Sequence, residues 1–382
     1  MNPKNIVILG STGSIGVQAL DIIREHPDRF NLLALSCNNS WEKMAKQIKE
    51  FEPEFGLIAN KKHFSVLNEA ISETDTTLLS GKEELLNLAT LEKADIVLNS
   101  LVGYAGFEPT LEALKAGNKV ALANKESLVV GGALINKIVG ESKGQLIPVD
   151  SEHSAMLQCL LGEPIDEVEN LIITASGGPF RTWNKKQMEG ITVDDALNHP
   201  NWSMGAKITV DSATMMNKGL EIIEAHWLFD IPYERIEAVV HPESIIHSVV
   251  TFNDGSSKAQ LGPPTMKVPI MYAFTYPDRE ELHVPRLDWG EAFQLNFEPV
   301  DYDRFPCLRL ALEAGRDGGF APAILNAANE VAVSRFLKEE ISYIQIADII
   351  ESSLVRLNNS GPFTLESLKK IDKEARKLAL TF

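Results

Sequence analysis

Residues 5–16 read NIVILGSTGSIG, a branched apolar run that passes directly into a turn containing Gly10, Gly13 and Gly16. The run Asn5–Leu9 is typical of a buried strand, and the residues after the turn have helical spacing. Glycines at such a junction permit a tight turn and let the backbone approach a pyrophosphate, which the N–H groups of the helix can bind. Because the spacing is GxxGxxG and not the common GxGxxG, an ordinary glycine turn remains the alternative.

The same alternation of strand and helix continues through the first 150 residues. Strands followed by helices at this interval predict right-handed crossovers and a parallel sheet. We therefore expect an α/β fold, with a Rossmann-like parallel sheet over residues 1–150. The predicted strands are Asn5–Leu9, Leu32–Leu35, Gly56–Ala59, Ile96–Leu98, Lys119–Leu122 and Leu146–Val149, and the predicted helices are Ile15–Glu25, Trp41–Phe51, Lys82–Ala89 and Thr110–Ala116.

From residue 151 onward the strands have less regular helical partners, which predicts a central α+β domain over residues 151–280. Within it, residues 176–206 are loop-like, and a loop that long is usually a lid. A linker over residues 281–305 leads to a predicted C-terminal helical bundle over residues 306–382. The predicted strands are Leu171–Thr174, Ala206–Val210, Ile236–Val240, Ser248–Phe252 and Lys258–Leu261, and the predicted helices are Cys307–Ala314, Pro322–Leu337, Ile344–Leu357 and Leu365–Leu380.

The composition excludes several classes of partner. Among 382 residues, 36 lysines and arginines face 53 aspartates and glutamates, so the formal net charge is −17, and bulk charge opposes nucleic-acid binding. No apolar run approaches the roughly 20 residues of a bilayer span, and the N-terminus lacks a signal-peptide pattern. Cys37, Cys159 and Cys307 are widely spaced, which is typical of reduced thiols. We expect a cytoplasmic protein without nucleic-acid or membrane partners.

The end of the second predicted strand bears on the choice of dinucleotide. NAD-binding proteins usually place an acid there for the ribose hydroxyls. Here the residues are Ser36, Cys37, Asn38 and Asn39, with no acid to repel a 2′-phosphate, which favours NADP. The nearest cation is Lys43, so the pattern permits NADP without providing an obvious clasp.

Two carboxylates follow the last strand of this region, in Asp150-Ser151-Glu152. In an extended backbone, residues two apart project from the same face, so both side chains would converge. Two like charges held that close need a cation or a shared proton, and an all-oxygen site suits Mg²⁺ or Mn²⁺, with Glu221 as candidate third ligand. The alternative is that Asp150 or Ser151 caps a helix starting near His153, with Glu152 in its first turn.

Other polar stretches suit a small anionic substrate. Residues 124–126 (NKE) lie at the carboxyl edge of the predicted sheet, where a lysine can polarise a carbonyl or can simply pair beside an asparagine helix cap. Residues 176–178 (SGG) and 212–214 (SAT) can cradle an anion with hydroxyl and N–H groups, and Asn217 and Lys218 can close on it. Turn and cap chemistry, or a solvated lysine, is the alternative for each.

Histidines and a tryptophan lie in or near the expected lid. His199 and Trp202, in HPNWSM, can cover a small substrate and exclude water. His241 and His247 flank a short PES stretch and are further candidates. Outside such a site these side chains are ordinary loop or core residues.

Taken together, these motifs resemble the 1-deoxy-D-xylulose 5-phosphate reductoisomerase family, NADPH-dependent enzymes of non-mevalonate isoprenoid biosynthesis. The resemblance runs along nearly the whole chain, and this set of motifs in this order is highly specific. It rests on GSTGSIG (Gly10–Gly16), LANKESLV (Leu122–Val129), PVDSEH (Pro148–His153), SGGPFR (Ser176–Arg181), HPNWSMG (His199–Gly205), VDSATMMNKGLE (Val210–Glu221), HPESIIHS (His241–Ser248) and NAANEVAV (Asn326–Val333).

The resemblance implies a cofactor, a metal and a substrate site. Asp150, Glu152 and Glu221 would bind Mg²⁺ or Mn²⁺ and, with Lys125, form the catalytic set. NADPH would contact Thr12, Gly13, Ser14, Ile15, Asn124, Glu126 and Gly205, with its adenosine end near Cys37, Asn38 and Asn39. The substrate would contact Lys125, Ser151, Glu152, Glu221, Trp202, Met204, His247 and Met266, and its phosphate chiefly Ser176, His199, Ser212, Asn217 and Lys218.

The resemblance also implies a reaction and an assembly. The substrate 1-deoxy-D-xylulose 5-phosphate would be isomerised and then reduced to 2-C-methyl-D-erythritol 4-phosphate by a homodimer whose central domain is catalytic and dimerising. The family usually has a glycine, and often a lysine, where this chain has Cys37 and Asn38, whereas Asn39 keeps its place. The strength of the preference for NADPH over NADH is therefore open at this point.

Two other classes of protein share part of the pattern. A two-domain dehydrogenase of the semialdehyde or homoserine type would account for the glycine turn but not for the three acids. A regulatory protein that senses a dinucleotide would bind NADPH without turning it over. Consumption of NADPH with the sugar phosphate and a divalent metal distinguishes the expected enzyme from such a sensor.

Overall fold

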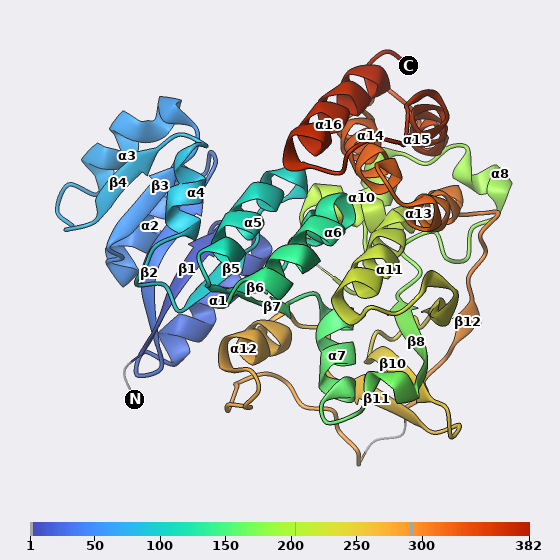
Figure 1. The fold of residues 1–382 in the computed structure, drawn as a ribbon, viewed down its shortest axis with the longest axis horizontal. Helices are drawn as coiled ribbons and strands as arrows, with labels where there is room; N and C mark the ends of the chain where they lie inside the picture. Colours follow the sequence, from blue (N-terminus) through green and yellow to red (C-terminus); the bar gives the residue numbers. More distant parts are fainter. Residues whose placement is uncertain (1–2, 203, 291–292) are drawn as a thin grey trace. The chain divides into compact units, whose positions relative to one another are not determined.

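The computed structural model describes residues 3–202, 204–290 and 293–382, which form two compact units (Figure 1). Unit 1 comprises Met1–Ser127, Leu134–Asp150 and Met266–Val284. Unit 2 comprises Leu128–Ala133, Ser151–Thr265 and Pro285–Phe382. Among the described residues, no helix combines the length and the apolar character that crossing a membrane requires.

Unit 1 is built on a seven-stranded parallel sheet in the order β4-β3-β2-β1-β5-β6-β7. The strand order reverses between β1 and β5, and folds of this kind bind ligands at the carboxyl ends of the strands beside such a reversal. The parallel sheet confirms the predicted α/β class. The strands are β1 (Lys4–Leu9), β2 (Phe30–Cys37), β3 (Phe55–Ile58), β4 (Thr77–Ser80), β5 (Ile96–Asn99), β6 (Lys119–Leu122) and β7 (Gln145–Pro148).

Helices alternate with the strands of this sheet along the chain. The burial of the first strand explains why the apolar runs are short and continuous. Ile6, Val7 and Ile8 are fully buried, as expected of a strand covered on both faces. The helix α12 (Lys267–Thr275) comes from much later in the chain and contacts α1, β6 and β7. The other helices are α1 (Ser14–Glu25), α2 (Trp41–Phe51), α3 (Phe64–Ala70), α4 (Glu84–Ala89), α5 (Phe107–Lys115) and α6 (Lys125–Glu141), with short 3₁₀ turns at η1 (Lys61–His63) and η2 (Gly103–Gly106).

Unit 2 contains a five-stranded mixed sheet in the order β11-β10-β8-β9-β12. Strands β8 and β9 are parallel, and the other pairs are antiparallel. The helix α7 (Ser151–Leu160) contacts β10 and β11, and α11 (Met216–Phe229) contacts β8 and β9. The strands are β8 (Val168–Ala175), β9 (Ile236–Val240), β10 (Ile246–Phe252), β11 (Ser257–Leu261) and β12 (Glu298–Pro299), with 3₁₀ turns at η3 (Ile165–Glu167) and η4 (Tyr233–Arg235).

The C-terminal helices form the predicted bundle, drawn in orange and red in Figure 1. Their buried residues, including Leu308, Leu325 and Ile350, share one hydrophobic core with α11 and the sheet of unit 2. The bundle is therefore continuous with the part of the chain that carries the predicted substrate residues. The helices are α13 (Pro306–Asp317), α14 (Ala321–Phe336), α15 (Ile344–Arg356) and α16 (Leu365–Ala379).

One predicted strand is wrong, because Ala206–Val210 belongs to the helix α10 (Ala206–Ala213). The branched residues in this stretch favour a strand locally. Val210 and Ala213 are nevertheless both buried, at the three-residue spacing of one helix face. Burial in the tertiary structure has outweighed the local preference of these residues for a strand.

The expected lid is not wholly irregular. It contains two short helices, α8 (Lys185–Met188) and α9 (Val193–Leu197), and each begins with a capping box. Ser203, within the lid, lies outside the described residues, as do residues 291–292 of the expected linker. The linker also contributes β12, which pairs with β9 at the edge of the sheet.

Candidate active site

The glycine turn of unit 1 has the strand–turn–helix setting that a phosphate-binding turn requires. Gly10 has a φ of +95°, and a Cβ there would lie 2.8 Å from the Ser100 carbonyl oxygen. A Cβ on Gly16 would lie 2.4 Å from the Gly10 carbonyl oxygen. Gly13 and Ser14 are exposed at the start of α1. Gly13 is the N-cap, and it has no side chain to form a hydrogen bond with the first N–H groups of the helix. The turn therefore presents a helix N-terminus, a favourable place for an anionic group.

The three residues expected at the adenosine end of the cofactor lie at the end of β2, and they differ in burial. Cys37 is buried with its Sγ 3.4 Å from Met44 Sδ, and burial raises the pKa of its thiol to about 12. Asn38 and Asn39 are exposed. Asn60, which follows β3, donates from its backbone N–H to the Asn38 carbonyl and from its side chain to Asn39 Oδ1, at 3.1 and 2.8 Å. The asparagines, and not the thiol, face outward.

The segment after β3 also carries two lysines, Lys61 and Lys62, that were not predicted as site residues. Asn60 is the N-cap of η1, and its Oδ1 accepts from the Lys62 backbone N–H at 3.1 Å. The Lys62 side chain is exposed, and Lys61 forms an ion pair with Glu83. In the sequence these lysines are far from Asn39, and only the parallel pairing of β2 with β3 shows that they belong to the same edge.

The start of α6 places three buried polar residues at the carboxyl end of β6. Asn124 is the N-cap, and its Oδ1 accepts from the Ser127 backbone N–H at 3.1 Å. This is the helix cap that was the alternative interpretation of residues 124–126. Its amide also donates to Glu126 Oε2 at 3.0 Å. Lys125 is 5 % exposed, and its Nζ lies 2.6 Å from Asp150 Oδ2. Neighbouring strands β6 and β7 thus bring Lys125 and Asp150 together.

A buried charged cluster lies between α7 and α11 in unit 2. Lys218 and Glu221 are three residues apart on α11 and share one face of it. The Lys218 ammonium donates to Glu152 Oε1 at 2.8 Å and also to Glu221 Oε2. Burial by itself lowers the pKa of Lys218, but attraction and hydrogen bonds from the two carboxylates outweigh it and raise the pKa above its ordinary value.

This cluster fits a divalent metal. Glu221 is 1 % exposed, and its Oε1 also accepts from Asn217 Nδ2 at 2.5 Å. The Lys218 ammonium stands between Glu152 and Glu221 as a cation, and the surrounding donors are hard oxygens of the kind that Mg²⁺ prefers. Asp150 precedes α7 directly in the chain. The extended geometry expected for residues 150–152 is wrong beyond Asp150, because Ser151 and Glu152 form the first turn of α7.

His153 and Glu224, neither of which was predicted as a site residue, support the cluster together with Ser151. His153 is fully buried; its Nε2 donates to the Glu221 carbonyl oxygen at 2.8 Å, and its Nδ1 lies 3.5 Å from Glu224 Oε2. Ser151 Oγ donates to Glu152 Oε2 at 2.6 Å. His153 therefore joins α7 to α11 behind the two carboxylates. Its position next to Glu152, and that of Glu224 one turn after Glu221, were the only signals available in the sequence.

Two polar residues within the expected lid, Ser176 and His199, suit an oxyanion. Ser176 Oγ and His199 Nε2 are 3.0 Å apart. His199 Nδ1 accepts from the backbone N–H groups of Asn201 and Trp202, at 3.2 and 3.0 Å, so the proton is on Nε2 and donates to Ser176. Burial lowers the pKa of His199, which favours this neutral form.

The glycines after Ser176 bring it close to Ser212. Gly178 has a φ of +65°, and a Cβ there would lie 2.8 Å from the Ser212 carbonyl oxygen. Gly178 N–H also donates to Ser176 Oγ at 3.2 Å. Ser212 is near the end of α10 and precedes Asn217 by five residues, so unit 2 assembles the predicted phosphate residues in one region.

The remaining predicted residues are His247, Trp202, Met204, Gly205 and Met266. His247, on β10, is 8 % exposed, and burial, helped by the charges of His241 and Lys218, lowers its pKa to about 4. Trp202 and Met204 are partly buried. Gly205 is the N-cap of α10 in unit 2, and Met266 is the N-cap of α12 in unit 1.

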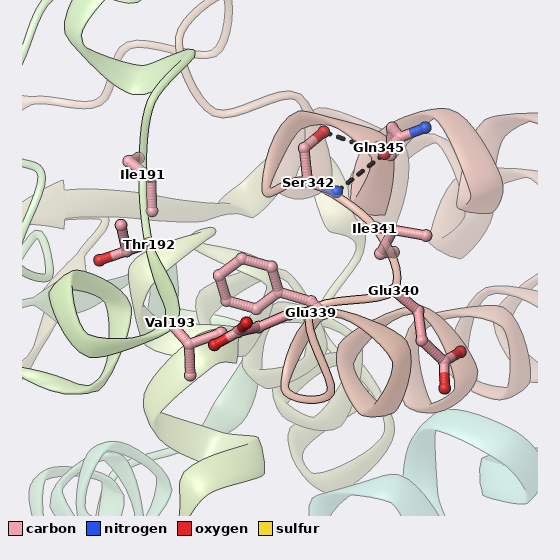
Figure 2. A pocket seen from close by; sticks show the side chains of 9 residues that line it. Ile191, Thr192, Val193, Glu339, Glu340, Ile341, Ser342 and Gln345 are labelled. Atoms are coloured by element: carbon pink, nitrogen blue, oxygen red, sulfur yellow. Dashed lines mark hydrogen bonds between the residues drawn. The ribbon is translucent and has the colours of Figure 1, made fainter.

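A cavity of about 480 Å³ elsewhere in unit 2 does not have this chemistry (Figure 2). It lies between the segment before α9 and the connection from α14 to α15. Two acids, Glu339 and Glu340, line it, and its described lining includes no lysine or arginine. Such a lining repels a phosphate group.

Comparisons with known proteins agree along the whole chain. Residues 6–132 match the family model described as 1-deoxy-D-xylulose 5-phosphate reductoisomerase, and residues 146–229 and 261–378 match its two C-terminal domain models. The chain is similar to the reductoisomerase of Chloroherpeton thalassium, 51% identical over 98% of this chain and 97% of the relative. It is 49% identical to that of Bacillus subtilis, over 98% of each chain.

Solved structures give the same result. The chain is similar to the reductoisomerase of Zymomonas mobilis in complex with NADPH, with a TM-score of 0.92 and 43% identity over 99% of this chain and 98% of the other. A reductoisomerase in complex with NADPH, fosmidomycin and magnesium has a TM-score of 0.94 and 41% identity over the same shares. On these matches, and on the arrangement of the buried acids and the glycine turn, the chain belongs to the 1-deoxy-D-xylulose 5-phosphate reductoisomerase family.

Proposed function

We propose that this chain isomerises 1-deoxy-D-xylulose 5-phosphate and reduces the product to 2-C-methyl-D-erythritol 4-phosphate, using NADPH and a divalent metal. Membership of the family supports the reaction. The observation that carries the proposal is the buried Glu152–Lys218–Glu221 cluster, in which Lys218 and Glu221 share α11 with Asn217, directly after the helix that carries Ser212. A cation site and an oxyanion site would adjoin there, as a sugar phosphate requires.

The metal would be held by Asp150, Glu152 and Glu221. When bound, it supplies Lewis-acid polarisation of the substrate's carbonyl and adjacent hydroxyl oxygens and a template for their orientation. Magnesium is present in the solved relatives, and we extend the proposal to manganese, because carboxylate oxygens suit both ions. Ser151 and His153 hold these carboxylates in place through Glu152 Oε2 and the Glu221 carbonyl.

The chain's own cations and hydroxyls orient the substrate. Lys125, at the carboxyl end of β6, would donate to the oxygen of the reacting carbon. Ser176, Ser212, Asn217 and Lys218 would donate to the phosphate, with neutral His199 donating from Nε2. The phosphate undergoes no bond change, so its binding energy is available to order the lid, including Trp202 and Met204, and to exclude water.

The reductant would be bound by unit 1. The N-terminus of α1, with Thr12, Gly13, Ser14 and Ile15, suits the pyrophosphate. Asn124, Glu126 and Gly205 would contact the nicotinamide half, and Asn38 and Asn39 the adenosine half, beside the buried Cys37. Hydride transfer from NADPH completes the reaction.

The proposal includes an arrangement of domains. Residues 1–150 would bind NADPH, and residues 151–280 would carry catalysis and dimerisation, with a lid over 176–206. Residues 281–305 would link this domain to the helical bundle of 306–382. A homodimer is supported by the exposed aromatic side chains Trp289 and Phe297, which are 72 % and 48 % accessible. A cytoplasmic location is supported by three buried free cysteines.

The function is tested by following NADPH absorbance with 1-deoxy-D-xylulose 5-phosphate and Mg²⁺ or Mn²⁺. We expect consumption that requires both substrate and metal, with 2-C-methyl-D-erythritol 4-phosphate as product. Binding of NADPH without consumption would instead indicate the sensing protein considered from the sequence. Consumption with a semialdehyde but not with the sugar phosphate would indicate the general dehydrogenase.

We further expect Lys62 to recognise the adenosine 2′-phosphate. In this type of fold the ribose lies at the end of β2, where Asn38 and Asn39 are tied to Asn60, directly before η1. Lys62→Gln should raise the dissociation constant of NADPH by about tenfold, the equivalent of about 1.4 kcal/mol, and leave that of NADH unchanged. Fluorescence titration of both cofactors measures this without turnover.

Two further lysines serve as controls for this prediction. Lys373→Gln makes the same charge change on an exposed position of α16 and should alter neither affinity. Lys43, the nearest cation in the sequence, provides the competing assignment. If Lys43→Gln weakened NADPH binding and Lys62→Gln did not, the assignment to η1 would be wrong.

A further inference from the structure

The junction of α10 and α11 carries much of the proposed phosphate site. Residues 212–215, which we call the 212–215 turn, comprise the last two residues of α10 and the two residues before α11, which carries Asn217 and Lys218. Met215 has a φ of +59°, a left-handed conformation that a side-chain-bearing residue rarely adopts without support from its surroundings. The position of Ser212 relative to Lys218 therefore depends on what holds this turn.

A tyrosine of the C-terminal bundle holds the main chain of the turn. Tyr343, just before α15, donates its hydroxyl to the Ala213 carbonyl oxygen at 2.8 Å. The tyrosine is 7 % exposed, and its ring makes edge contacts with Phe180 and Phe336, at centroid distances of 5.4 and 6.2 Å. With the ring fixed from two sides, the hydroxyl defines the position of the Ala213 carbonyl.

Another helix of the bundle contacts the chain just before Ala213. Asn329, on α14, donates its Nδ2 to Asp211 Oδ1 at 2.9 Å, and Lys207 Nζ lies 2.7 Å from Asp211 Oδ2. The bundle thus contributes two polar contacts to residues 211–213, one from Asn329 on α14 and one from Tyr343, just before α15.

These contacts are buried and far apart in sequence. Asn329 is fully buried and Asp211 is 1 % exposed. Asn329 Oδ1 has no hydrogen-bond partner among the residues that the structure describes, which is an unfavourable state for a buried amide. Packing alone would be served better by an apolar side chain of the same shape. The Nδ2 bond to Asp211 is the gain that offsets this cost.

The glycines after Ser176 also approach this turn. Gly178 approaches the Ser212 carbonyl so closely that a Cβ would lie 2.8 Å from it. The 212–215 turn is therefore enclosed between the bundle and the glycines that follow Ser176. A shift of the turn of even a few tenths of an ångström would change the distance between the Ser176 and Ser212 hydroxyls.

We propose that Tyr343 and Asn329 are positioning residues for phosphate recognition. They hold the 212–215 turn so that Ser212, Asn217 and Lys218 are arranged before the substrate binds, which reduces the entropy lost on binding. This inference rests on the proposed function, because it concerns the phosphate of that substrate. It assigns to the C-terminal bundle a part in substrate recognition without direct contact.

The test replaces Tyr343 by phenylalanine, which removes the hydroxyl and keeps the ring. We expect the KM for the sugar phosphate to rise about fivefold and the inhibition constant of inorganic phosphate to rise by the same factor. The KM for NADPH should stay unchanged, and kcat should stay within about twofold. Asn329→Leu, which keeps the approximate shape but removes the amide donor, should act in the same direction.

Ser353→Ala is the matched control. Ser353 is a fully buried residue of α15 whose hydroxyl donates to the Ile349 carbonyl at 2.7 Å, so this variant also removes one buried hydroxyl bond to a main-chain carbonyl. It should lower the thermal unfolding midpoint without changing either constant for phosphate. An equal rise of both constants in Ser353→Ala, or no rise in Tyr343→Phe, would overturn the positioning role. Absence of turnover in the unmodified protein would instead overturn the proposed function.

Discussion

Replacement of Glu221 by glutamine should reduce turnover at least about a thousandfold, because the neutral amide keeps the shape of the side chain but loses the charge that we propose to hold a divalent cation. Glu221 is 1 % exposed and meets the Lys218 ammonium, so solvent cannot substitute for the missing carboxylate. NADPH absorbance measures turnover, and calorimetry with Mn²⁺ measures the loss of metal affinity. Fluorescence titration should show that NADPH still binds, because the glycine turn belongs to unit 1.

Glu224 provides the comparison for this prediction. It lies on the same helix, one turn further on, and is fully buried, with Oε2 3.5 Å from His153 Nδ1. Glu224→Gln should retain metal affinity, because its carboxylate faces the supporting histidine. If Glu224→Gln abolished Mn²⁺ binding and Glu221→Gln preserved it, the two glutamates would have to exchange roles.

Replacement of Lys218 by methionine should have two effects of comparable size. The KM for the sugar phosphate should rise about a hundredfold, because the variant lacks the buried ammonium that we propose as a charge-assisted donor to the phosphate. In the absence of metal, the variant should also lose about 3–5 kcal/mol of unfolding free energy, because Glu152 and Glu221 are left as buried like charges without their cation. Steady-state kinetics and thermal unfolding measure the two effects.

The second effect should depend on the metal, which distinguishes it from a general loss of packing. Saturating Mg²⁺ or Mn²⁺ should restore much of the stability of Lys218→Met, because it binds only the folded state. Lys267→Met removes a partly buried ammonium from a pair with Glu25 on unit 1 and should show no such recovery. A Lys218→Met protein that is stable without metal and has an unchanged KM would show that the ammonium serves neither the carboxylates nor the phosphate.

Much of the fold follows from local patterns. The continuous branched runs of β1 and β6 are what burial on both faces of a parallel sheet requires, and for these two strands the predicted and observed bounds agree closely. The short strand β4 was not predicted. The C-terminal helices could be predicted because their apolar residues recur at helical spacing. The wrong prediction at Ala206–Val210 has the same origin. A short branched run fits the period of a strand as well as that of a helix, and only burial against α11 and α14 decides for the helix.

The chemistry of the site was more predictable than its support. Asp150, Glu152, Glu221 and Lys218 stand out in the sequence because charged residues lie in recognisable motifs. Cys37 was expected at the adenosine end of the cofactor, but its thiol is buried against Met44 from α2, and only that packing shows which way it points. Lys62 was missed because its place beside Asn39 arises from the pairing of two strands.

The amino-acid sequence by itself determined the class of fold, because strands and helices depend on residues close together in the chain, and its motifs led to the charged groups that we propose for metal, phosphate and cofactor. The tertiary structure decided which groups hold them in place. His153 meets Glu221 across 68 residues, and Tyr343 meets Ala213 across 130. Such contacts are set by the packing of whole helices and by the need to pair buried polar atoms, and no local pattern encodes them.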